Sequence, residues 1–108
     1  MSTNRTDLSI TANVKAIEAI KADLLTSVAA LNASLVKPLS LQNERAELLA
    51  EVVVGAYTLA GRLGISCEDV DACAADRLKR DVLEEGARAR DAAILLKYIE
   101  RQRNREEQ

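Results

Sequence analysis

The segment from Leu48 to Leu63 is the strongest constraint on how this chain folds, because it predicts a helix that is apolar on nearly every side. Gly64 follows it, and glycine is the usual left-handed residue after a helix. A helix that is apolar all round has to be covered all round. A chain of 108 residues forms one domain with few other helices to cover it. The segment therefore predicts association with a second chain.

A long helix is predicted before this segment, over about residues 9 to 35. Asp7 or Ser9 caps its start, and Pro38 forces its end because the residue before a proline is pushed out of helical conformation. The second helix begins at Ser40 or Asn43 and runs to Leu63. The apolar residues of the first helix follow a spacing of three and four, except where Lys21 interrupts it: Ile10, Val14, Ile17, Leu24, Val28, Leu31 and Leu35.

Two further helices complete the predicted fold. Ser66, with Asp69 three residues on, is typical of a helix start. This third helix breaks near Glu84-Glu85-Gly86, and a fourth spans about residues 87 to 103. No segment shows the alternation of a strand. We expect one all-α domain over residues 1 to 108, a bundle of about four helices completed by dimerisation, with frayed ends at about 1 to 7 and 104 to 108.

The composition narrows the chemistry and the partners. The chain has no histidine, which excludes histidine bases, zinc sites with histidine ligands and serine or cysteine triads. Its net charge of -2 argues against a nucleic-acid binder or a protein of anionic membrane surfaces. The N-terminus is polar and unlike a signal peptide, and no uninterrupted apolar run approaches the ~18 residues that a membrane span requires. We expect a cytoplasmic protein.

Two groups of charged residues are candidates for chemistry. Glu44, Glu47 and Glu51 lie within roughly 60° of one another on the second helix, and such carboxylates can supply part of a Mg²⁺ site. Arg77 and Arg80 are one turn apart on the third helix and can clamp phosphate. A solvated helix face is the simpler explanation of each group, and both interpretations stay open. No residue is assigned a catalytic role.

The order of residues around Leu59-Ala60-Gly61-Arg62-Leu63-Gly64-Ile65 resembles the MazG pattern, in which an acid and an apolar helix precede Arg-Leu-Gly-Ile. Asn13-Val14-Lys15 and Glu84-Glu85-Gly86 are similar to features of the short MazG-like proteins. The resemblance covers about residues 8 to 100. It implies an all-α nucleoside triphosphate pyrophosphatase fold that assembles as a dimer or a dimer of dimers.

The same resemblance implies Mg²⁺-dependent cleavage of a nucleotide between its α and β phosphates, with the metal held by Glu-x-x-Glu on one helix and Glu-x-x-Asp on the next. Glu51 matches the final acid of that pattern, but the acid three residues earlier falls on Leu48. On the first helix Asp23 matches one acid, and the position three before it is Ile20. Arg77 stands where the family has a phosphate-binding lysine.

Two hypotheses follow. In the first, the chain is a homodimeric nucleotide pyrophosphohydrolase or nucleotide-binding protein, with Glu51, Glu47, Asp23 and Glu44 as metal ligands and Arg77 and Arg80 on the substrate phosphates. In the second, it is a catalytically inactive helical homodimer that acts as a protein-interaction module. Convergence of the acids would favour the first hypothesis, and acids that point into solvent would favour the second.

Overall fold

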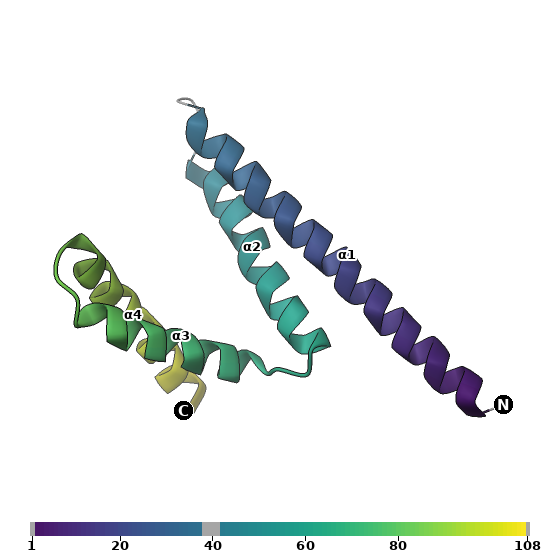
Figure 1. Ribbon diagram of the computed structural model, residues 1–108. Coiled ribbons are helices and arrows are strands. Elements are labelled where there is room, and N and C mark those ends of the chain that lie inside the picture. Colours follow the sequence, from purple (N-terminus) through teal and green to yellow (C-terminus); the bar gives the residue numbers. More distant parts are fainter. Residues whose placement is uncertain (1, 38–41, 108) are drawn as a thin grey trace. The chain divides into compact units, whose positions relative to one another are not determined.

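The computed structural model describes residues 2–37 and 42–107, which form four helices (Figure 1). They are α1 (Ser2–Val36), α2 (Gln42–Arg62), α3 (Cys67–Val82) and α4 (Ala87–Glu107). The described part of the chain contains no strand, which confirms the all-α prediction. The helices pair into two compact units, Met1–Ile65 and Ser66–Gln108. Assembly of the whole chain as one domain stays a prediction.

The predicted start of the first helix was wrong. α1 begins at Ser2, so Asp7 and Ser9 lie inside the helix instead of capping it. The physical reason is that no glycine or proline stands before residue 9 to interrupt the helix. Similarly, α2 contains Asn43 within its first turn, while Ser40 lies outside the described residues.

The end of α2 and the start of α3 are as predicted. Gly64 has a φ of 78°, and the N–H of Ile65 donates to the carbonyl of Ala60 at 2.8 Å. Together with the Gly64 N–H on the Gly61 carbonyl at 3.2 Å, this is a Schellman ending, which satisfies carbonyls that the helix leaves free. Ser66 then caps α3 and accepts a hydrogen bond from the Asp69 N–H at 3.0 Å.

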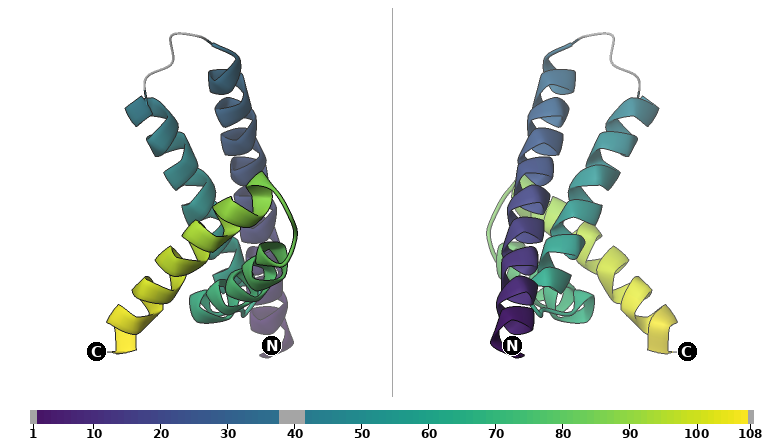
Figure 2. Two further views of the ribbon diagram at one scale, coloured as in Figure 1. Left: turned by 90° about the vertical axis from the view of Figure 1, so that its left-hand side faces the viewer. Right: turned by 90° about the vertical axis from the view of Figure 1, so that its right-hand side faces the viewer.

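The first unit is an antiparallel hairpin of α1 and α2 (Figures 1 and 2). The two helices approach closely at Gly55, where an added Cβ would stand 3.0 Å from Leu24 Cδ1. We call the contact line between the two helices the seam. Its half-buried apolar members recur at spacings of three and four on each helix: Ile17, Ile20, Leu24 and Leu31 on α1, and Leu48, Val52 and Leu59 on α2.

The apolar spacing predicted for the first helix proved to combine two stripes. Ile17, Leu24 and Leu31 enter the seam, whereas the remaining members of that set are at least 46% exposed. On both helices an exposed apolar stripe lies beside the seam, roughly 55° round the axis on α1 and about 100° on α2. Viewed along one axis, successive residues advance clockwise on one helix and anticlockwise on its antiparallel partner. Both stripes follow the seam in the direction of advance, so they lie on the same side of the hairpin. We call this side the outer apolar face: Ile10, Val14, Val28 and Leu35 of α1, and Leu49 and Val53 of α2.

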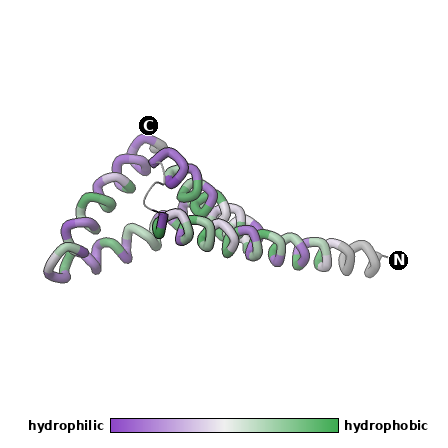
Figure 3. The backbone as a smooth tube through the Cα atoms, turned by 90° about the horizontal axis from the view of Figure 1, so that it is seen from above, coloured by the Kyte–Doolittle hydropathy of each residue, from purple (hydrophilic) through white to green (hydrophobic). Residues whose placement is uncertain are grey.

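The second unit is a hairpin of α3 and α4 packed through alanines. Ala75 is 1% exposed and Ala92 is 3% exposed, and their small side chains allow the two helices to approach closely. Among the described residues no large side chain is fully buried. In Figure 3, hydrophobic residues recur along α1 and α2, while the C-terminal part of α4 is largely hydrophilic. The apolar surface therefore greatly exceeds what either hairpin covers.

One stretch of α1 has the length and apolar composition of a membrane-spanning helix. It covers Ser9–Val36, 28 residues near the N-terminus. The sequence interpretation had considered uninterrupted apolar runs alone and did not identify this stretch. Core helices of soluble proteins have the same two properties, so the cytoplasmic location stays a prediction.

Candidate functional site

Glu51 meets the hydroxyl of Ser27 across the seam. Ser27 Oγ lies 3.4 Å from Glu51 Oε2 and donates a shorter hydrogen bond, 3.0 Å, to the backbone carbonyl of Asp23. Because a serine hydroxyl has one proton, the carbonyl takes the main share and the contact with Glu51 is the weaker one. Asp23 lies one turn before Ser27 on the same stripe of α1. Ser27 is not among the candidate residues predicted from the sequence, although its spacing of four from Asp23 was a usable signal.

The other two glutamates of the predicted site lie farther along α2. Glu47 is one turn and Glu44 about two turns from Glu51, and all three side chains are exposed. Since α1 runs in the opposite direction, each turn towards Glu44 also leads away from Asp23. The structure thus brings Glu51 to Ser27, one turn from Asp23, and leaves Glu44 and Glu47 in solvent along the same stripe.

The polar side of the hairpin continues beyond Glu51. Thr58 bonds back to the carbonyl of Val54 at 2.7 Å, and Arg62 Nη1 donates to Asn13 Oδ1 at 3.5 Å. Thr58 and Arg62 continue the stripe of Glu44, Glu47 and Glu51 along α2. Their contacts are within or between α1 and α2, so the stripe serves at least partly to join the helices.

The predicted phosphate residues belong to the second unit. Arg77 Nε lies 3.4 Å from Asp81 Oδ1, an ion pair between residues one turn apart on α3. The Arg77 side chain is 62% exposed, which makes the pair weakly stabilising. Arg80 is exposed on the same helix. This ion pair is typical of a solvent-exposed helix surface, the alternative to a phosphate clamp at these residues.

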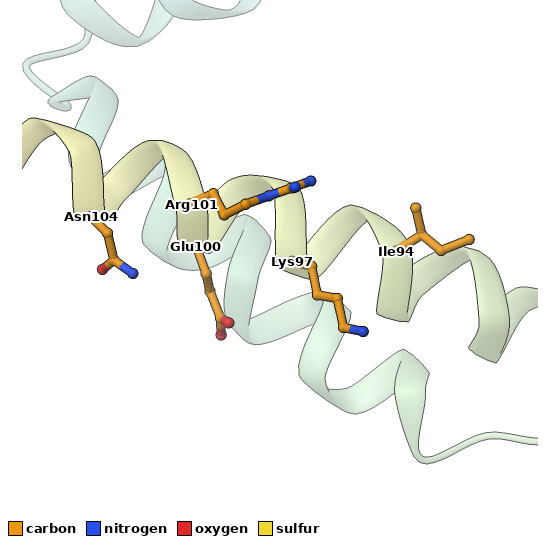
Figure 4. A pocket seen from close by; sticks show the side chains of 5 residues that line it. All are labelled: Ile94, Lys97, Glu100, Arg101 and Asn104. Carbon is orange, nitrogen blue, oxygen red and sulfur yellow. The ribbon is translucent and has the colours of Figure 1, made fainter.

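A shallow hollow lies along α4 (Figure 4). It measures about 340 Å³ and is lined by residues of that one helix: Ile94, Lys97, Glu100, Arg101 and Asn104. Figure 4 shows these side chains spread along the helix without converging on a point. None of the predicted site residues lines it.

The sequence of residues 10–92 matches the profile of the MazG-like family. This match covers more than half of the chain. The chain belongs to the MazG-like family. No curated protein and no solved structure gives a significant match. The match confirms the resemblance seen in the sequence and places the protein in a nucleotide-pyrophosphatase-like family with an all-α fold.

The metal ligands that membership of the MazG-like family implies can be compared with the residues present. Leu48 and Ile20, at two of the four expected acid positions, are half-buried in the seam. Among the described residues, no three side chains of aspartate, glutamate or cysteine come together as a cation site. Magnesium requires several oxygen ligands in near-octahedral geometry. The four-carboxylate site therefore does not fit this single chain.

Proposed function

We propose that this MazG-like protein is a catalytically inactive homodimer that acts as a protein-interaction module. The observation that carries the proposal is the outer apolar face, where Ile10 is 58% and Val53 is 52% exposed, while no large side chain among the described residues is fully buried. A monomeric soluble protein rarely leaves a continuous apolar surface of this kind uncovered. A second copy offers the same face, and a two-fold dimer brings two such faces together as a four-helix bundle.

The loss of hydrolysis is supported by the residues at the expected acid positions. Leu48 and Ile20 carry no ligand atom, and Glu51 contacts a hydroxyl instead of a second carboxylate. The protein is expected to release no pyrophosphate from any of the four common ribonucleoside triphosphates or their deoxy forms with Mg²⁺. Pyrophosphate release above a blank, abolished by Glu51→Gln, would contradict this part of the proposal.

The dimer is tested with two neighbouring valines of α2. Val53 lies on the outer apolar face, while Val54 is 62% exposed and points to another side of the helix. Val53→Asp should convert the dimer to monomer in analytical ultracentrifugation, because it places a charge in the interface. Val54→Asp should leave the dimer intact. A monomeric wild-type protein, or equal effects of the two substitutions, would overturn the proposal.

A second function, binding of a nucleoside triphosphate with its Mg²⁺, is favoured by one observation. Glu51 Oε2 lies 3.4 Å from the hydroxyl of Ser27, and Asp23, whose backbone carbonyl accepts a hydrogen bond from the same hydroxyl, stands one turn before Ser27 on α1. One or two carboxylates commonly contact a magnesium ion that substrate phosphates also hold. In this case Glu47 and Glu44 would extend the acidic side of the hairpin along α2.

Isothermal titration separates the two functions. If the second holds, nucleoside triphosphate with Mg²⁺ binds the wild-type protein, and Glu51→Gln weakens binding about tenfold or more. Glu18→Gln is the matched control, since Glu18 pairs with Lys21 at 3.1 Å on the exposed surface of α1. Absence of binding at millimolar nucleotide, or equal effects of the two substitutions, excludes the second function.

A further inference from the structure

The register of the α1–α2 hairpin shows which residues face each other at the expected metal position. Leu24 meets Gly55 across the seam, and Ser27 meets Glu51. In an antiparallel pair, seven residues forward on one helix and seven back on the other return to an equivalent pair. From Leu24 and Gly55 this step leads to Leu31 and Leu48. Both leucines are half-buried, as residues of a seam should be.

The cross-section of the seam around Glu51 therefore contains one carboxylate, one hydroxyl and two leucines. Glu51 and Leu48 occupy the two positions on α2 where the family pattern has acids, and Ser27 and Leu31 are the residues of α1 that face them. The sequence alignment had pointed to Asp23 and Ile20 on α1. The register places the facing positions at Ser27 and Leu31 instead, about one and two turns after Asp23, and neither residue is an acid.

We infer that this seam is a former metal site that apolar residues have converted into helix packing. Leu31 and Leu48 stand at positions where a metal site would have carboxylates, and they stabilise the helix pair by burying apolar surface instead of binding a cation. At the third position the hydroxyl of Ser27 replaces a charged ligand. The wild-type chain consequently has no specific site for Mg²⁺ at Glu51. Restoring carboxylates at the facing positions re-creates one.

The test is a gain of function. The double variant Ser27→Asp/Leu48→Glu places three carboxylates, with Glu51, at facing positions. Titration with Mn²⁺, followed by the electron paramagnetic resonance of the free ion, should show one ion per chain at least about tenfold tighter than wild type, whose binding is expected to be ~1 mM or weaker. Thermal unfolding of the variant should shift upward with Mn²⁺, and that of the wild type should not.

Ser27→Asp/Val54→Glu is the control, because it adds the same charges with one of them on another side of α2. The inference is overturned if the wild type binds Mn²⁺ saturably well below ~1 mM. It is also overturned if Ser27→Asp/Leu48→Glu, once shown to be helical, binds Mn²⁺ no tighter than the control. If the double variant does not fold, Ser27→Asp alone must bind Mn²⁺ tighter than Val54→Asp. Failure of that comparison is equally decisive.

The inference concerns the expected metal site and rests on one part of the proposed function, the loss of hydrolysis. The two fail separately. Pyrophosphate release by the wild type, or a monomer in the ultracentrifuge, contradicts the proposed function whatever the variants bind. A restored variant that binds no Mn²⁺ contradicts the inference and leaves the dimer unaffected.

Discussion

A methyl group added to Gly55 would lie 3.0 Å from Leu24 Cδ1, so these two residues set the distance between α1 and α2. A methyl group added to Gly61, six residues later on α2, would have no neighbour within 4 Å. Alanine is about 1 kcal/mol better than glycine inside a helix. Gly61→Ala should therefore raise the free energy of unfolding by up to about that amount.

Gly55→Ala should gain less than Gly61→Ala, because Leu24 must move aside, and Gly55→Val should destabilise by about 1–3 kcal/mol through overpacking. Urea unfolding followed by circular dichroism measures all three. A stabilisation from Gly55→Val as large as that from Gly61→Ala would show that the hairpin does not close on Gly55.

The cap of α3 gives a second prediction. The Ser66 hydroxyl accepts the N–H of Asp69 at 3.0 Å, one of the first donors that a helix leaves without a partner. Ser66→Ala should cost about 1 kcal/mol of unfolding free energy. Ser66→Asp keeps an acceptor and should cost little, and the comparison of the two separates loss of the cap from loss of the side chain.

The left-handed residue after α2 gives a third prediction. Gly64 has a φ of 78°, a conformation in which a Cβ clashes with the backbone. Gly64→Ala should lower the free energy of unfolding by about 1–2 kcal/mol. Gly64→Asn should lower it less, because asparagine tolerates this region. Equal losses for the two variants would indicate that contacts of the glycine, and not its φ, decide.

These local features are the part of the fold that the sequence predicted well. Ser66 and Gly64 act through residues within five positions along the chain, so their signals are complete in the sequence. The start of α1 was missed because Asp7 and Ser9 are capable caps, yet nothing before them stops the helix. A residue that can cap a helix therefore does not by itself determine where the helix begins.

The candidate site was predicted less well, because it depends on register. The sequence of α1 carries two overlapping apolar stripes, and it does not say which one meets α2. The small side of α2 at Gly55 selects the stripe of Leu24. That choice makes Ser27 the residue facing Glu51. Asp23, the residue of α1 that matches an acid of the family pattern, therefore lies one turn before the residue that faces Glu51.

The exposed stripe leads to the last prediction, a melting temperature that depends on protein concentration. If the outer apolar face is covered only in the dimer, dilution favours the unfolded monomer by mass action. A tenfold increase in concentration adds about 1.4 kcal/mol, which for a dimer of this size is an upward shift of roughly 2–4 °C. Val54→Asp should preserve this dependence, and Val53→Asp should remove it along with much of the stability. A melting temperature of the wild-type protein that is constant over a hundredfold range of concentration would show that the apolar face is not covered by a second copy.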